Sequence, residues 1–265
     1  MAPRAPIGIF DSGIGGLTVA NAIVNILPHE TLFYFGDTAH VPYGGKSAET
    51  VVKYSHDIVS FLLDQGCKAI VVACNTASAA ALASLRHNWP SIPIIGMEPA
   101  VKPASSATQT GVVGILATRG TFSSERYANL VDRFGHGITV LENPCIGLVE
   151  LIEAGLVDDA ITENFLHQIL TPMLDKGADT FVLGCTHYPL VRPLIERIIP
   201  PSATIIDPAP AVARQLQRRL QHLSLLSDQR TDDHHFFVSG DPHAFHTMAK
   251  RFFLADFLLE QHLIY

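Results

Sequence analysis

The feature that most constrains this sequence is a regular alternation of short apolar runs with longer segments of helical spacing. The apolar runs are Ile7–Phe10, Leu32–Gly36, Ala69–Ala73, Ile92–Gly96, Val112–Ala117, Ile138–Glu142, Thr180–Gly184 and Thr204–Ile206. Between them lie segments such as Ala48–Gln65, Ala77–Asn88, Ser123–Phe134 and Glu163–Lys176. Continuous apolar strands separated by amphipathic helices are typical of parallel sheets that helices cover on both faces. The alternation therefore predicts an α/β fold.

The chain also resembles itself in two places. The segment from Gly8 to Gly13 is similar to the segment from Gly114 to Gly120, and Val71–Thr76 is similar to Val182–His187. Both pairs have a similar separation along the chain, which suggests a duplicated α/β unit. We expect the two units to face each other, with one cysteine on each side of a shared cleft.

The segment beyond Asp207 carries weaker signals. We expect a helix over Ala209–Leu226, one more strand at Phe236–Val238 and a last helix over Ala244–Phe257.

Composition narrows the class of protein. A chain of 265 residues is long for one domain and comfortable for two. Its formal charge of −7 gives it no general attraction for nucleic acid or anionic membranes. Too few residues precede the first apolar run for a signal peptide, and no run approaches the roughly 20 apolar residues of a membrane span. We expect a cytoplasmic protein.

Four cysteines are present, and their contexts differ. None forms a CxxC pair, so we expect free thiols and no structural zinc site. Cys67 and Cys145 have the context of buried apolar cysteines. Cys74 and Cys185 each follow a predicted strand and precede a predicted helix. The positive end of a helix dipole stabilises a thiolate, so we expect the pKa of these two thiols to be lowered.

Two bases on opposite faces of one carbon can invert its configuration, because one removes a proton and the other delivers one. A thiolate and a thiol must then be present together. The repeated cysteines thus suggest a racemase that uses side chains alone.

Acids and a histidine accompany the two cysteines. Asp11 ends the first predicted strand, and His187 lies two residues beyond Cys185, so either could tune a thiol. Asp11 could equally cap the following helix. Asp37 and Glu153 are weaker candidates.

Hydroxyl and amide side chains recur at the strand ends, where ligands bind in open α/β sheets. They are Ser12, Asn75, Thr76, Thr118, Thr121 and Thr186. With helix N-terminal N–H groups, they could hold the carboxylates and ammonium of an amino acid. Tyr43 and Gly44 lie in a loop where the backbone could approach such a ligand.

Other sequence motifs give little indication of function. The run Gly13–Gly16 lacks the spacing of a nucleotide-binding motif, and no lysine has the context of a pyridoxal Schiff base. The histidines near the end of the chain, at 234, 235, 243 and 246, match no familiar metal-ligand spacing, and we expect them to be solvated.

Together these segments resemble the glutamate racemase family. The matching motifs are Ile9–Thr18, Gly36–Thr38, Pro42–Gly44, Ala73–Ser78, Ala117-Thr118 with Gly120-Thr121, and Leu183–Pro189. They occur in family order across residues 7–208, about three quarters of the chain.

The resemblance implies two pseudo-symmetric α/β domains with the active site in the cleft between them. The first would comprise residues 1–98 and 208–265, and the second residues 99–207. Cys74 and Cys185 would be the two bases, with Asp11 and His187 assisting. Glutamate would be held by Asp11, Ser12, Tyr43, Gly44, Asn75, Thr76, Thr186 and His187, and Glu153 would assist near Cys185.

The resemblance further implies an isomerase that needs neither pyridoxal phosphate nor a metal. Its product, D-glutamate, would supply bacterial peptidoglycan synthesis, and so cell-wall biogenesis and cell shape. By family analogy, Cys74 would remove the α-proton of D-glutamate and Cys185 that of L-glutamate. It leaves open a homodimer and activation by a peptidoglycan precursor.

Three alternatives stay open at this point. A racemase of aspartate or another small amino acid would share the mechanism, because one methylene in a pocket discriminates by only about 1–3 kcal/mol. A cysteine hydrolase would use one thiol as a nucleophile and leave the other dispensable. A non-catalytic amino-acid-binding protein would bind its ligand without exchanging the α-proton.

Overall fold

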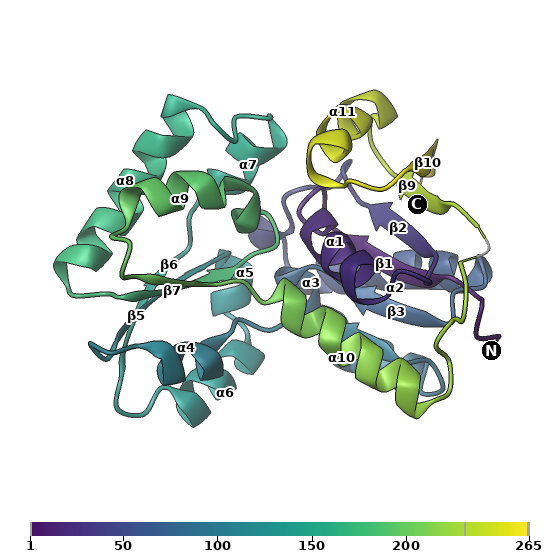
Figure 1. The fold of residues 1–265 in the computed structure, drawn as a ribbon, viewed down its shortest axis with the longest axis horizontal. Coiled ribbons are helices and arrows are strands. Elements are labelled where there is room, and N and C mark those ends of the chain that lie inside the picture. Colours follow the sequence, from purple (N-terminus) through teal and green to yellow (C-terminus); the bar gives the residue numbers. More distant parts are fainter. Residues whose placement is uncertain (1, 231, 264–265) are drawn as a thin grey trace.

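The structure, a computed structural model, describes residues 2–230 and 232–263 and contains two sheets side by side (Figure 1). The larger sheet has the strand order β10-β9-β2-β1-β3-β4 and the smaller sheet the order β6-β5-β7-β8. Their bounds are β1 Ile7–Asp11, β2 Leu32–Gly36, β3 Ala69–Val72, β4 Ile94–Gly96, β5 Val112–Ala117, β6 Thr139–Asn143, β7 Thr180–Gly184, β8 Thr204–Ile206, β9 His234–Val238 and β10 Phe257–Gln261. Every strand pair among the described residues is parallel. The predicted α/β class is confirmed.

The internal resemblance of the sequence is a repeat of topology. In the larger sheet the order β2-β1-β3-β4 corresponds strand by strand to β6-β5-β7-β8 in the smaller one. Cys74 follows β3 and Cys185 follows β7, which are equivalent strands of the two units. The strands at 7–96 and 234–261 share one sheet, and those at 112–206 share the other. The boundaries at residues 98 and 207 stay a prediction.

Alternating side chains anchor helices on both faces of the larger sheet. Ile7, Ile9 and Tyr34 belong to one buried cluster, which packs against α1 (Leu17–Ile26), α10 (Ala209–His222) and α11 (Pro242–Phe252). Phe10 and Phe35 belong to a second cluster, beneath α2 (Ala48–Asp64) and α3 (Asn75–Asn88). Successive residues of a strand point to opposite faces, so strands covered on both sides are apolar throughout.

The smaller sheet is covered in the same way. Phe181 and Leu183 face α7 (Leu148–Glu153), α8 (Ala160–Asp175) and α9 (Arg192–Ile198). Val113 and Ile115 face α4 (Val101–Ala107) and α6 (Glu125–Phe134). Three short elements complete the chain: η1 Tyr43–Gly45, α5 Arg119–Phe122 and η2 Tyr188–Val191. Among the described residues, no helix combines the length and apolarity needed to cross a membrane.

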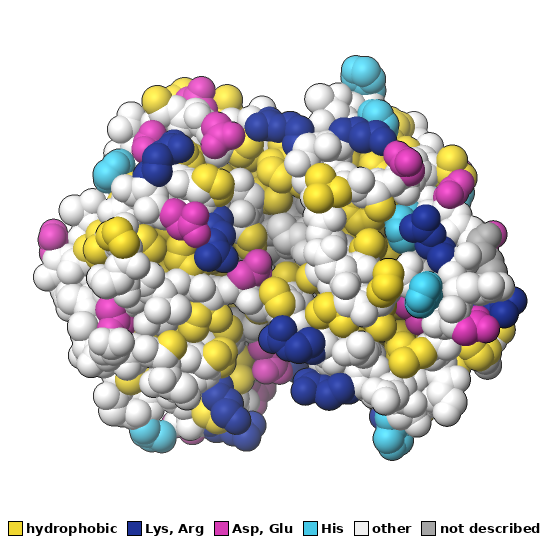
Figure 2. All heavy atoms as spheres, viewed as in Figure 1, with side chains coloured by type: hydrophobic (Ala, Val, Ile, Leu, Met, Phe, Trp, Pro, Cys, Tyr) yellow, Lys and Arg dark blue, Asp and Glu magenta, His cyan; other side chains and the backbone are white. Residues whose placement is uncertain are grey.

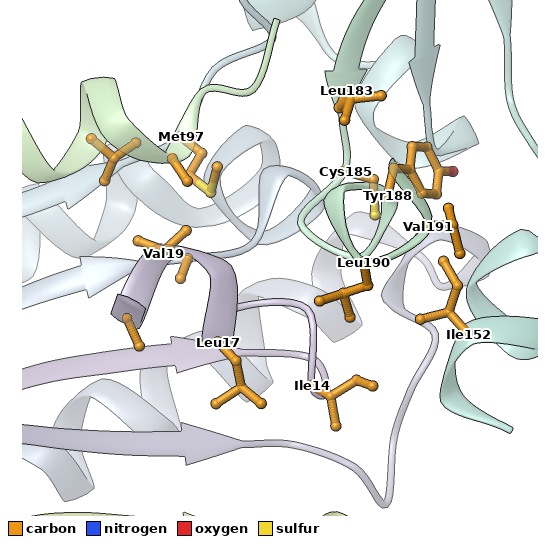
Figure 3. Close-up of a cluster of buried hydrophobic side chains, with 14 of the residues drawn as sticks. Ile14, Leu17, Val19, Met97, Ile152, Leu183, Cys185, Tyr188, Leu190 and Val191 are labelled. Carbon is orange, nitrogen blue, oxygen red and sulfur yellow. The ribbon is translucent and has the colours of Figure 1, made fainter. Parts of the chain in front are cut away.

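The two units are joined by an apolar contact at the carboxyl ends of their strands. Ile14, in the loop after β1, lies near Leu190 of η2 and Ile152 of α7 (Figure 3). All three side chains are buried within one cluster. This contact brings the reactive strand ends of both units against each other.

The final part of the chain departs from the sequence prediction. The helix expected over Ala244–Phe257 ends at Phe252, and Phe257 begins β10 instead. Within the described part of the chain, this strand pairs with β9 alone, and the local sequence pattern does not reveal that pairing. The helix expected to reach Leu226 ends at His222. The expectation that the last histidines are solvated is wrong for His234, which is buried and accepts a hydrogen bond from the Leu32 N–H.

Candidate active site

The two repeated cysteines open onto one small cavity between the carboxyl ends of the two sheets. Its walls are formed by Ser12, Pro42, Tyr43, Gly44, Cys74, Asn75, Thr76, Thr118, Val149, Cys185, Thr186 and His187. Both cysteines are free thiols and are buried. The arrangement can therefore offer two sulfur bases to a single bound molecule.

Cys74 is held by the N-terminus of a helix. It is the N-cap residue of α3, and its sulfur accepts the N–H of Ala77 at 3.4 Å. Its thiol lies 4.0 Å from Ser12 Oγ. Burial, together with the nearby charge of Asp11, raises the pKa of Cys74 well above its usual range. The expected lowering of this pKa is wrong, because desolvation outweighs the helix N-terminus.

Cys185 has a different partner. Its sulfur lies 3.8 Å from His187 Nδ1, and His187 Nε2 lies 2.6 Å from Glu153 Oε1. Burial alone would lower the pKa of His187, but hydrogen bonds to Cys185 and Glu153 raise it well above its usual range. An imidazolium beside a thiol favours the thiolate form. On the Cys185 side of the cavity, the sulfur therefore lies directly beside an imidazole that can exchange a proton with it.

Glu153 also connects the two units. The same oxygen that faces His187 accepts the N–H of Ile14 at 3.0 Å. Ile14 belongs to the loop after β1, whereas Glu153 ends α7 of the other unit. The geometry of His187 therefore depends on the two units being in contact.

Asp11 lies one layer behind the cavity wall. One carboxylate oxygen accepts the N–H groups of Gly13 and Gly16 at 3.1 and 3.0 Å. The other accepts the Thr186 hydroxyl at 3.2 Å. Helix α1 begins at Leu17, so Asp11 organises the loop before the helix instead of acting as its N-cap. Burial raises the pKa of Asp11, although the Gly13 and Gly16 N–H groups and the charge of His187 oppose the shift.

An unpartnered amide marks the cavity as a binding site. Asn75 is buried, and neither its Oδ1 nor its Nδ2 has a hydrogen-bond partner among the described residues. A buried polar group without a partner costs about 1–3 kcal/mol, so a ligand is the natural partner of this amide. Hydroxyl groups lie beside it: Thr76 Oγ1 is 2.8 Å from Thr118 Oγ1, which is 3.1 Å from Thr121 Oγ1.

The predicted site residues thus fall into two layers. Ten of them line the cavity: Ser12, Tyr43, Gly44, Cys74, Asn75, Thr76, Thr118, Cys185, Thr186 and His187. The other four, Asp11, Asp37, Thr121 and Glu153, contact lining residues from behind. Sequence reasoning missed Pro42 and Val149, since an apolar wall residue carries no chemical signal. The predicted burial of Cys67 and Cys145 is confirmed.

Comparison with known proteins agrees with this geometry. Residues 7–216 match the family model described as Asp/Glu/Hydantoin racemase. The chain is 51% identical over 238 residues to a glutamate racemase of Ectopseudomonas mendocina, covering 90% of each protein. It is similar to a Francisella tularensis glutamate racemase solved in complex with D-glutamate (34% identity, TM-score 0.86, 99% and 98% coverage). It is also similar to the Escherichia coli glutamate racemase solved with L-glutamate and the activator UDP-MurNAc-Ala (33% identity, TM-score 0.88, 98% and 99% coverage).

Proposed function

The chain belongs to the Asp/Glu/hydantoin racemase family, and on that premise we propose that it interconverts L-glutamate and D-glutamate without a cofactor. The observation that carries the proposal is the pair of buried sulfurs in one cavity. The glutamate racemases it resembles cover nearly its whole length. Its product, D-glutamate, supplies peptidoglycan synthesis, and so the cell wall and cell shape.

The reaction begins with one sulfur ionised and the other protonated. His187, positively charged between Cys185 and Glu153, favours a thiolate at Cys185. Burial keeps Cys74 as a thiol. The Cys185 thiolate removes the α-proton of L-glutamate, and the Cys74 thiol delivers its proton to the opposite face of Cα. D-glutamate leaves with Cys74 ionised and Cys185 protonated, and that form is ready for the reverse reaction.

The cavity wall supplies hydrogen-bond donors for the charge that develops on the α-carboxylate as the proton leaves. The Ser12, Thr76 and Thr186 hydroxyls and the Asn75 amide line the site. Fixed donors in a site closed to water stabilise such charge more strongly than water does. We propose that Tyr43 and Gly44 close the wall over the substrate, while Asp11, Thr118 and Thr121 hold the donors in place.

Deuterium exchange tests the proposal most directly. Purified protein is incubated with L-glutamate in D₂O while optical rotation and the α-proton NMR signal are followed. We expect rotation to disappear as deuterium enters Cα. Exchange with aspartate but not glutamate would keep the mechanism and change the substrate. Exchange with neither would contradict the proposal and favour a hydrolase or a binding protein.

A further proposal concerns regulation. A groove runs between α3 of one unit and α5–α6 of the other, and it is lined by Lys46, Arg119 and Arg126 together with Glu125. Arg126 also pairs with Glu98. The face in Figure 2 has Lys and Arg side chains beside the waist between the two lobes, with acidic side chains next to them, whereas the groove itself is defined by its lining residues. We infer that this cationic groove binds an anionic peptidoglycan precursor such as UDP-MurNAc-Ala. An increase in kcat on adding UDP-MurNAc-Ala, lost in Arg126→Ala, would support this inference.

Location and assembly also remain proposals. We infer a cytoplasmic enzyme, because all four cysteines are free thiols. A homodimer is a prediction that light scattering of the purified protein would test.

A further inference from the structure

The chain returns from the second unit to the first and brings a serine close to the active-site loop. Ser239 follows β9 and is buried. Its hydroxyl donates to Asp37 Oδ1 at 2.6 Å and accepts the N–H of Ala39 at 3.0 Å. Ser239 thus joins the final segment of the chain to the loop that follows β2.

Asp37 connects Ser239 to the wall of the cavity. Besides Ser239, its carboxylate accepts the Tyr43 hydroxyl at 2.5 Å and lies 2.8 Å from His40 Nδ1. Asp37 is itself buried, and neither it nor Ser239 lines the cavity. Tyr43 and the following Gly44 do line it. The network therefore ends on substrate-facing residues without touching substrate.

The loop that contains Tyr43 and Gly44 packs closely against the other unit. A Cβ atom placed on Gly44 would lie 2.7 Å from Thr118 Cβ and 3.0 Å from Thr118 Cγ2. Contacts this close leave little room for the loop to shift. A small displacement of Tyr43 would therefore alter the shape of the cavity.

We propose that Ser239 is a positioning residue for the reaction, acting through Asp37 and Tyr43 to fix the wall of the cavity formed by Tyr43 and Gly44. The proposal rests on the proposed function, since it concerns the binding of glutamate in that cavity. It gives a role in substrate binding to a segment whose sequence carries no catalytic motif.

The central variant is Ser239→Ala, which removes the hydroxyl from Asp37. Loss of one hydrogen bond to a charged group should loosen the wall, and we expect KM to rise about five- to tenfold for both enantiomers. We expect kcat to change less than about twofold, because a wall that contacts substrate and transition state alike contributes uniform binding.

A matched control separates positioning from simple stabilisation. The Gly240 N–H donates to Thr38 Oγ1 at 3.0 Å, which joins the same two segments without involving Asp37. Thr38→Val should lower the melting temperature about as much as Ser239→Ala but leave KM unchanged. Equal increases in KM for both variants would overturn the proposal.

Double variants give a second readout. Tyr43→Phe removes the hydroxyl at the far end of the network, so adding Ser239→Ala to it should raise KM little further. Fully additive effects would mean that Ser239 acts elsewhere. If Ser239→Ala does not fold, Ser239→Cys, which keeps the shape of the side chain but donates only a weak hydrogen bond, provides the same comparison with Tyr43→Phe.

The wild-type protein is assayed in the same series. An inactive wild type would contradict the proposed function, whereas an active wild type with an unchanged KM in Ser239→Ala would contradict only the positioning role.

Discussion

The two thiols follow equivalent strands of a repeated topology, yet their surroundings differ. Cys74 precedes the 14-residue helix α3 and receives a backbone N–H from it. Cys185 precedes the four-residue η2 and contacts the side chain of His187, which in turn contacts Glu153. The duplication explains why two sulfurs face one cavity. The difference between the halves gives the two sulfurs different neighbours, a backbone N–H for Cys74 and an imidazole for Cys185.

The strongest test of the comparison removes each sulfur in turn. Cys74→Ser and Cys185→Ser should each lower the racemisation rate by at least about 10²–10⁴-fold, because serine is too weak a base to replace a thiolate. Each variant keeps one sulfur, so residual α-proton exchange in D₂O should be confined to one enantiomer. By family analogy, Cys74→Ser should still exchange L-glutamate and Cys185→Ser should still exchange D-glutamate. Substantial racemisation in either variant would refute the two-thiol mechanism.

A second test acts on the Cys185 half alone. Glu153→Gln keeps the shape of the side chain but removes the charge opposite His187, so the imidazolium and the Cys185 thiolate both lose support. We expect kcat with L-glutamate to fall about 10- to 100-fold and kcat with D-glutamate to fall less.

Enantiomers have equal free energies, so kcat/KM must stay equal in the two directions, and the asymmetry can appear only in kcat and KM separately. Glu163→Gln, which removes an acid paired with Arg197 on the surface, is the matched control. Equal losses of kcat with both enantiomers would show that Glu153 serves the whole site and not one half.

The smallest expected effect is on how the free energy of unfolding varies with pH. The folded-state pKa of His187 is raised by its contacts with Cys185 and Glu153, against the effect of burial. The stability that this charge contributes is therefore fully present below about pH 6.5, the unfolded value, and is lost as pH rises through the folded value. The stability lost in His187→Asn should thus be largest near pH 6 and shrink at alkaline pH, as urea titrations can measure.

The surface pair His235–Glu260 offers a control. A surface ion pair contributes only about 0–1 kcal/mol, so the stability lost in His235→Asn, which also removes the stacking of the ring on Phe237, should vary little with pH. A stability difference for His187→Asn that does not vary with pH would mean that folding leaves the pKa of His187 unchanged.

The comparison of the halves also shows what sequence could predict. The strands and both cysteine motifs have strong local patterns, so the α/β class and the two thiols could be predicted. The direction of the Cys74 pKa shift could not, because it depends on burial, which the whole fold decides. The contact between Asp37 and Ser239 joins residues 202 positions apart, and no local pattern reveals such a pair. Strand β10 was missed for the same reason, since among the described residues it pairs only with the distant β9.

The return of the chain to the larger sheet has a consequence for synthesis on the ribosome. Strand β2 pairs with β1 on one side and with β9 on the other, but β9 is made almost two hundred residues after β2. The smaller sheet has all of its strands by residue 206 and can form while the outer edge of β2 is still unpaired. An unpaired edge strand is a template for association with other chains. Nascent chains that stall before His234 should therefore aggregate or recruit chaperones more readily than completed ones.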